Sequence, residues 1–172
     1  MRIEEETQAL AARIRAVLAA AFGGGNEADL VERLRADGLV RLALVALEDG
    51  EAEDGEVVGH VVFSDLAVEV DGRKVDAVAL APVAVRPDRQ RRGTGAALIR
   101  AGLERLRRDG CEAVVVLGHP RYYPRFGFSP ALARKLAAPF AGDAFMALEL
   151  AEGALAGAAG SVRYPDAFGI AG

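Results

Sequence analysis

The segment from Val75 to Leu117 limits the fold of this chain more than any other stretch. It begins with a long apolar run, Val75–Val85, and passes through the polar, glycine-containing turn Gln90–Gly95 into a helix. Five residues that recur at helical spacing predict this helix, which ends at Asp109-Gly110. They are Leu98, Ile99, Gly102, Leu103 and Leu106. A short apolar strand, Ala113–Leu117, follows. This order of strand, turn, helix and strand predicts a βαβ-like unit within an α/β fold.

The rest of the sequence predicts strands and two further helices around this unit. One helix is expected from Thr7, as N-cap, to the glycines after Phe22, and a second from Asn26, as its cap, to Gly38. Strands are expected at these runs: Arg2–Glu4, Leu39–Leu47, Val57–Phe63, Val68–Val70, Phe145–Leu150 and Val162–Tyr164. The acidic stretch from Glu48 to Glu56 is predicted to be a solvated hairpin tip, and Asp71-Gly72 is predicted to form a second turn.

These elements predict one domain over residues 1–172, with the motif region at about 75–130 and a loop-rich tail at 151–172. The expected architecture is a mixed, mostly antiparallel central sheet with helices on both faces. Pro82 cannot donate to a ladder, so the sheet must be irregular there, at an edge or at a bulge. The main-chain groups near Val83–Val85 would then be free to pair with a ligand that carries an amide arm.

Composition excludes several classes of function. The net charge of −4 offers no general attraction to nucleic acid, and no apolar run reaches the length of a membrane span or a signal core. Cys111 is the only cysteine and reads as a small buried hydrophobe, which fits a reducing cytoplasm and excludes a disulfide framework. The two histidines, His60 and His119, have no acidic partner at ligand spacing, so no metal site is expected.

The turn Gln90–Gly95 has the features of an anion-binding site. Amides at a helix N-terminus point outward unpaired, and Gly93 and Gly95 allow a pyrophosphate to approach the main chain closely. Four arginines crowd into seven residues of an acidic protein just here: Arg86, Arg89, Arg91 and Arg92. The spacing matches neither the P-loop nor the dinucleotide fingerprint, which argues against ATP and NAD. Glycines at such a turn are also common in proteins that bind nothing, so the turn alone leaves both readings open.

Three motifs taken together resemble the GCN5-related N-acetyltransferase (GNAT) family. They are Val83-Ala84-Val85, the Gln90–Gly95 turn, and the sequence from Tyr122 to Phe128. Leu117-Gly118-His119-Pro120 ahead of the third motif resembles the YhbS-like subgroup of predicted N-acetyltransferases. The resemblance implies that acetyl-CoA is the co-substrate and that Val83, Ala84 and Val85 hold its pantetheine arm. It further implies a pyrophosphate site made by these residues: Gln90, Arg91, Arg92, Gly93, Thr94, Gly95 and Ala96.

The resemblance also assigns chemistry to the third motif. Tyr123 matches the tyrosine that protonates the departing thiolate, while Tyr122 is expected to pack the core. No acidic residue clearly matches the family's base. His119, at a strand end beside Tyr123, is the better functional candidate of the two histidines, although a capping or loop-bracing role fits it as well. His60 alternates with valines on an apolar strand and reads as a satisfied core histidine.

The predicted function is acetyl transfer from acetyl-CoA to a primary amine, directly within a ternary complex. Two alternatives stay open: a module that binds acyl-CoA without chemistry, and an acetyltransferase for a protein lysine or N-terminus. The expected partner is a small-molecule amine or a peptide, with neither nucleic acid nor membrane, and the family also allows a homodimer.

Overall fold

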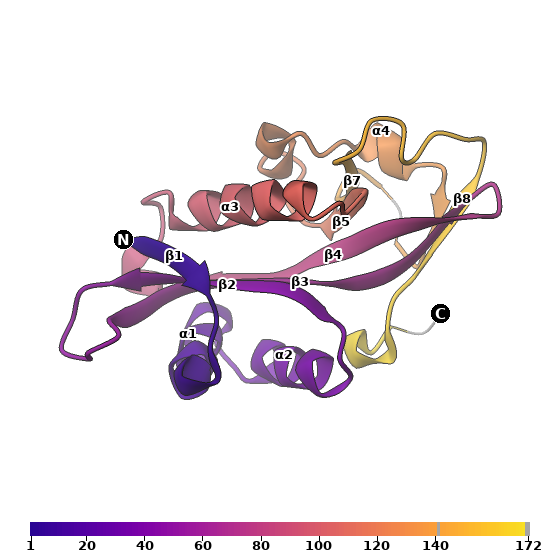
Figure 1. The fold of residues 1–172 in the computed structure, drawn as a ribbon. Helices are drawn as coiled ribbons and strands as arrows, with labels where there is room; N and C mark the ends of the chain where they lie inside the picture. The colour runs from indigo at the N-terminus through magenta and orange to yellow at the C-terminus, as the bar shows by residue number, and fades with distance from the viewer. Residues whose placement is uncertain (141, 171–172) are drawn as a thin grey trace. The chain divides into compact units, whose positions relative to one another are not determined.

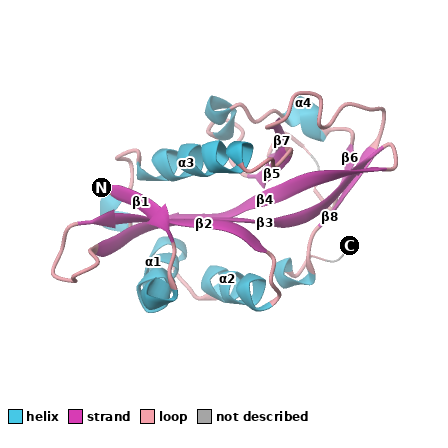
Figure 2. Ribbon diagram, in the orientation of Figure 1, coloured by secondary structure: helices cyan, strands magenta, loops and turns pink. Residues whose placement is uncertain are grey.

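The computed structural model describes residues 1–140 and 142–170 (Figure 1). Strand pairing follows the order β1-β2-β3-β4-β5-β7, with β8 pairing with β3 and β6. The strands are β1 Arg2–Glu5, β2 Val40–Glu48, β3 Glu56–Val70, β4 Arg73–Val85, β5 Ala113–Leu117, β6 Leu136–Ala137, β7 Phe145–Glu149 and β8 Gly160–Arg163. The helices are α1 Ala11–Phe22, α2 Asn26–Ala36, α3 Thr94–Arg108 and the short α4 Pro130–Ala133 (Figure 2). Antiparallel pairs dominate, with β4–β5 and β6–β8 parallel, and this confirms the predicted mixed sheet.

Two compact units divide the chain. Unit 1 contains Met1–Phe63 and Ala81–Glu104, and unit 2 contains Ser64–Leu80 and the chain from Arg105 onward. The strands β3 and β4 each contribute to both units. The prediction of a single domain over residues 1–172 stays a prediction.

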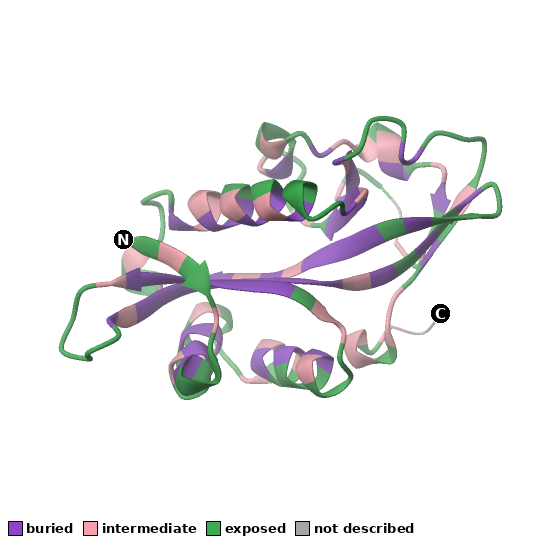
Figure 3. Cartoon of the chain, in the orientation of Figure 1, coloured by how far each residue is buried: buried purple, intermediate pink, exposed green. Residues whose placement is uncertain are grey.

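One face of the strands in unit 1 packs against α1 and α2 (Figure 1). Ile14, Val17 and Leu18 are buried at the spacing of one helical face, which is why α1 forms against the sheet rather than in isolation. Figure 3 shows the buried stripe and the exposed outer side of both helices. Thr7 is the N-cap residue of the 3₁₀ turn Gln8–Leu10 that leads into α1, but its side chain makes no capping hydrogen bond. The cap predicted at Asn26 is wrong, because Asn26 is already the first helical residue.

Within unit 1 the opposite face of the strands is covered by α3, and two glycines set how closely it approaches (Figure 1). A Cβ on Gly102 would overlap the Phe63 ring, and a Cβ on Gly59 would lie 2.9 Å from a methyl group of Leu98. These contacts confirm helices on both faces of unit 1. They also give Gly102 a packing reason to lie inside a helix, where glycine is otherwise unfavourable.

Gly102→Ala is expected to lower the free energy of unfolding by about 1–3 kcal/mol, because the new methyl group overlaps a buried ring. Helix propensity opposes this loss by up to about 1 kcal/mol, so the net effect is destabilising. Urea unfolding would measure it. Combining Gly102→Ala with Phe63→Leu should recover part of the loss as a coupling energy, and a Gly102→Ala protein as stable as the wild type would contradict the packing argument.

The strand predicted at Val68–Val70 is the end of β3 rather than a separate element, because β3 continues unbroken from Glu56 to Val70. The predicted turn is confirmed: Asp71 (φ +49°) and Gly72 (φ +78°) both have positive φ, as a type I′ hairpin requires. The Asp71 carboxylate accepts hydrogen bonds from the N–H groups of Ala158 and Ala159, which lowers its pKa. This turn is thereby fastened to the segment that leads into β8.

A second hydrophobic core lies in unit 2. It contains side chains from the unit-2 parts of β3 and β4, from β5, and from the chain after β5, among them Val70, Ala113, Val115, Ala147 and Leu155. Ala77–Ala79 of β4 pair in parallel with Ala113–Val115 of β5, and β5 pairs along its whole length with β7. The sequence patterns gave no indication of α4 or β6, which are too short to show a period. No helix in the described part of the chain combines the length and the apolar character needed to cross a membrane.

Candidate functional site

The segment that follows β4 in unit 1 forms the predicted turn. After Val85 a short 3₁₀ turn, Pro87–Arg89, leads into Gln90, whose side-chain amide donates a hydrogen bond of 3.0 Å to the Val85 carbonyl. Gln90 therefore braces the turn against the strand end. Arg91 (φ +64°) and Gly93 (φ +84°) then reverse the backbone before α3 begins at Thr94. A non-glycine residue with positive φ is uncommon, and such strain often accompanies a functional site.

The first turn of α3 presents unpaired amides. The N–H of Ala97 makes the first helical hydrogen bond, 2.9 Å to the Gly93 carbonyl, so the N–H groups of Thr94, Gly95 and Ala96 precede the bonded ladder. Arg91 and Arg92 are exposed and form no hydrogen bond or ion pair with residues 1–140 or 142–170. Free amides, the positive helix terminus and two unpaired guanidinium groups suit a diphosphate.

The other two arginines of the predicted basic cluster are neutralised. Arg86 pairs with Asp88 (2.6 Å) and Glu56 (3.4 Å), and Arg89 pairs with Glu48 (2.9 Å) and Asp88 (2.9 Å). The hydrogen bond from Arg89 lowers the pKa of Glu48, so this carboxylate stays charged. The acidic stretch is an exposed turn between β2 and β3, as predicted, but its two ends, Glu48 and Glu56, also hold the arginines that precede the turn.

Val83, Ala84 and Val85 form the end of β4 in unit 1, where burial alternates and Ala84 is the buried member. Pro82 lies immediately before them, after a cis Ala81–Pro82 peptide and beyond the Ala77–Ala79 ladder with β5. Its missing N–H agrees with a position outside that ladder.

Tyr123 lies in unit 2, at the start of the 3₁₀ turn Tyr123–Phe126 after β5. Its side chain is 8 % exposed, and its ring meets Phe128 edge-on with centroids 5.8 Å apart. A Cβ on Gly118 would overlap this ring, so only glycine at that position lets the ring lie on the backbone. Burial, with a smaller contribution from Tyr122, raises the pKa of Tyr123 to about 12. The phenol is therefore a protonated donor at neutral pH.

Tyr122 packs edge-on against Tyr123 and Phe126 but stays partly exposed, so the prediction that Tyr122 rather than Tyr123 is the buried core aromatic is wrong. The Arg125 guanidinium stacks over Tyr122 at 4.3 Å from the ring centroid. His119 has an exposed side chain, and its carbonyl accepts hydrogen bonds from the N–H groups of Tyr122 (3.0 Å) and Tyr123 (3.3 Å). His119 thus braces the turn that holds Tyr123, through its main chain.

His60 belongs to a partly buried network with Glu6 and Arg35 in unit 1 that the sequence did not indicate. Its Nε2 lies 2.7 Å from Glu6 Oε1, and Arg35 donates two hydrogen bonds of 2.7 and 2.8 Å to the same carboxylate. His60 is fully buried, as expected, yet its Nδ1 has no hydrogen-bond partner among the described residues. The prediction that His60 is a buried core residue is confirmed, but the prediction that its hydrogen bonds are satisfied is wrong for Nδ1. Glu6 lies 54 positions away along the chain, which is why no local pattern could reveal the pair.

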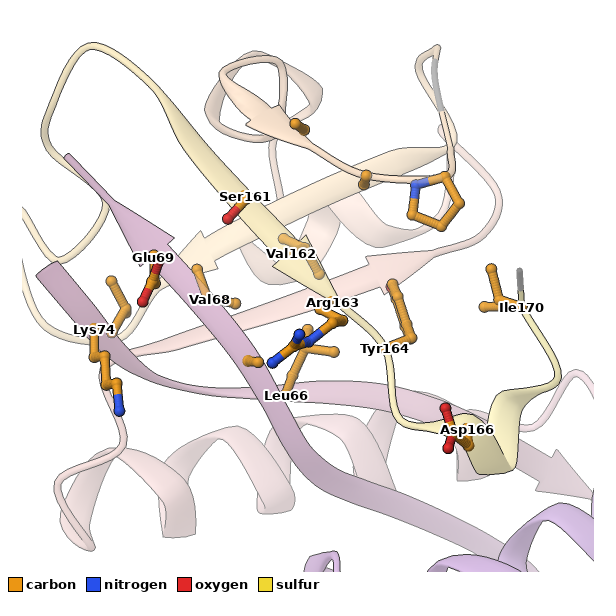
Figure 4. A pocket seen from close by; sticks show the side chains of 15 residues that line it. Leu66, Val68, Glu69, Lys74, Ser161, Val162, Arg163, Tyr164, Asp166 and Ile170 are labelled. Atoms are coloured by element: carbon orange, nitrogen blue, oxygen red, sulfur yellow. The ribbon is translucent and has the colours of Figure 1, made fainter. Parts of the chain in front are cut away.

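A pocket of about 900 Å³ in unit 2 contains none of the site residues predicted from sequence (Figure 4). It is formed by β3, β4, β8 and the C-terminal segment, and its wall carries charges of both signs from Glu69, Lys74, Arg163 and Asp166.

Cys111 is buried in unit 2, as predicted. Among the described residues, no group of three or more His, Cys, Asp or Glu side chains is arranged to hold a metal ion.

The sequence matches the family described as the acetyltransferase (GNAT) domain over residues 2–131. The N-acetyltransferase YhbS of Escherichia coli K12 is 41% identical over 172 residues, which cover 98% of each chain. The crystal structure of YhbS in complex with CoA superposes with a TM-score of 0.86 and 38% identity, covering 99% of this chain and 93% of that one. The crystal structure of a GNAT family acetyltransferase from Brucella melitensis in complex with acetyl-CoA superposes with a TM-score of 0.75 and 37% identity, covering 97% of both chains. This chain therefore belongs to the GNAT family of acetyltransferases.

Proposed function

We propose that this protein transfers the acetyl group of acetyl-CoA to a primary amine, directly and without a covalent enzyme intermediate. The observation that carries the proposal is the first turn of α3, where free amides and the unpaired Arg91 and Arg92 provide a site for the CoA pyrophosphate. Support comes from two relatives above 35% identity whose crystal structures hold CoA or acetyl-CoA.

Different residues of this chain would bind different parts of CoA. Arg91 to Ala96 would hold the pyrophosphate, and Gln90 would fix the turn through its hydrogen bond to the Val85 carbonyl. The main-chain groups of Val83, Ala84 and Val85 would pair with the amides of the pantetheine arm, as an added strand does. Glu48 and Glu56 keep Arg86 and Arg89 in place and so fix the position of the turn.

Tyr123 is the proposed general acid. When the amine nitrogen has attacked the thioester carbon and the carbon–sulfur bond breaks, the departing thiolate needs a proton, and the Tyr123 hydroxyl supplies it. A pKa near 12 keeps that proton in place until it is needed. The proposal requires the hydroxyl to come within hydrogen-bond reach of the sulfur when acetyl-CoA is bound.

Replacing Arg91 and Arg92 together by alanine is expected to weaken CoA binding by about 10-fold or more at low salt, since each contact with phosphate is charge-assisted. Isothermal titration calorimetry with CoA measures it. Arg107→Ala with Arg108→Ala removes the same charge from exposed positions at the other end of α3 and should leave the affinity unchanged. Wild-type protein that gives no heat with CoA would overturn the proposal.

The acceptor is open to a direct screen. Purified protein and acetyl-CoA would be mixed in turn with spermidine, amino acids, kanamycin and short peptides, and the release of CoA thiol followed. Turnover with small amines supports the proposed function, and turnover with peptides alone supports acetylation of a protein lysine or N-terminus. Tight CoA binding without turnover of any amine supports the sensing module instead.

A further inference from the structure

The proposed reaction lacks a group that removes a proton from the acceptor. Amines of the expected class are ammonium ions at neutral pH and cannot attack a carbonyl carbon until one proton has left. We propose that His60, oriented by Glu6, accepts this proton through an ordered water, an inference that rests on the proposed function.

The hydrogen bonds around His60 fix which ring nitrogen is basic. Burial raises the pKa of Glu6, but the hydrogen bonds from His60 and Arg35, together with the positive charge of Arg35, outweigh this effect and lower the pKa to about 2. Glu6 is therefore an ionised carboxylate that can only accept, so the proton of a neutral His60 must be on Nε2, facing Glu6. The lone pair is then on Nδ1, the atom without a partner.

An unsatisfied lone pair in a fully buried side chain needs an explanation, because leaving a buried polar group unpaired costs about 1–3 kcal/mol. A carboxylate on one ring nitrogen and a free lone pair on the other is the arrangement by which an acidic residue prepares a histidine to act as a base. The carboxylate fixes the ring and stabilises the imidazolium that forms. Glu6 is thus a positioning residue, and Arg35 holds it by two hydrogen bonds.

The location of His60 supports the same role. Arg86 N–H donates to the Val58 carbonyl at 2.8 Å, and β3 and β4 run antiparallel because they are joined by the turn at Asp71-Gly72. A Cβ on Gly59, the neighbour of His60 in β3, would lie 3.3 Å from the carbonyl oxygen of Ala84, so this part of β3 runs beside Ala84. Ala84 is the centre of the segment proposed to hold the pantetheine arm. The unpartnered nitrogen therefore belongs to the strand next to that segment.

The proton balance of the reaction is complete with these two residues. One proton of the ammonium passes through water to His60 Nδ1, and the freed nitrogen lone pair forms the bond to the thioester carbon. The carbon–sulfur bond then breaks, sulfur takes the proton of Tyr123, and the second proton of the amine restores the phenol through water. His60 finally releases its proton to solvent, leaving an N-acetylated amine and CoA thiol.

The test is His60→Gln, whose side-chain amide can still donate to Glu6 while offering no basic nitrogen. With the amine that the wild type acetylates fastest in the screen, kcat/KM at neutral pH should fall about 100-fold or more. The loss should shrink steadily as the pH rises toward the pKa of the free amine. Hydroxylamine, which is already neutral at neutral pH, should be acetylated by variant and wild type at rates within about threefold, since it needs no base.

Glu6→Gln gives a second readout that a merely structural role would not move. Without the carboxylate the imidazole is neither oriented nor stabilised as an imidazolium, so the plateau of the kcat/KM profile should drop and the shape of its acid limb should change. Unchanged activity and pH profile in His60→Gln would overturn the inference. A wild type that binds CoA but acetylates no amine would instead overturn the proposed function, so the two failures are distinguishable.

Discussion

Tyr123→Phe is expected to reduce kcat by about 100-fold or more while the Kd for CoA stays within about twofold of the wild-type value. The substitution removes only the hydroxyl, so the buried ring keeps its packing against Phe128 and over Gly118. What is lost is the proton for the departing thiolate. Steady-state release of CoA thiol and calorimetry with CoA separate the two quantities.

The adjacent tyrosine provides the matched control. Tyr122 lies with its ring centroid 5.1 Å from that of Tyr123, and Tyr122→Phe removes an equivalent hydroxyl from a more exposed ring. This variant should keep kcat close to the wild-type value. Because the pKa of Tyr123 is about 12, alkaline loss of activity through its ionisation should appear only near that pH. Full activity of Tyr123→Phe would rule out the proposed acid.

Glu6→Ala is expected to lower the free energy of unfolding by about 2–3 kcal/mol, because it leaves the buried His60 without its hydrogen-bond partner and the partly exposed Arg35 without a counter-charge. Urea unfolding at neutral pH measures the loss. Glu4 on β1 is the control: its ion pair with Arg2 is largely exposed, so Glu4→Ala should cost less than about 1 kcal/mol.

The same carboxylate gives the wild-type protein a defined acid sensitivity. The pKa of Glu6 falls from an ordinary 4.5 to about 2 in the folded protein, so the unfolded chain binds its proton first as the pH drops. The stability from Glu6 is fully present above 4.5 and is lost as the pH falls toward 2. Glu6→Gln should lack this part of the pH dependence. Equal slopes for wild type and variant below pH 4.5 would show that the network is not the source.

The sequence by itself determined the features that depend on neighbours along the chain. The apolar periods predicted α3 and β5, Asp71-Gly72 predicted the hairpin, and the turn Gln90–Gly95 predicted unpaired amides at a helix start. These follow from local rules, because side-chain spacing and glycine conformation act within a few residues. Together with the Tyr123 motif they were sufficient to indicate the family.

Only the tertiary structure decided which charged and polar groups are free. The four arginines around the turn look alike in sequence, yet Glu48 pairs with Arg89 and Glu56 with Arg86, while Arg91 and Arg92 have no partner in the described part of the chain. The ring buried over Gly118 is Tyr123 rather than Tyr122, and His60 contacts the carboxylate of Glu6, which lies 54 positions away along the chain. These hydrogen bonds and ion pairs join residues that lie dozens of positions apart in the sequence and meet only in the fold. Local hydrophobic periodicity and motif spacing therefore cannot predict them.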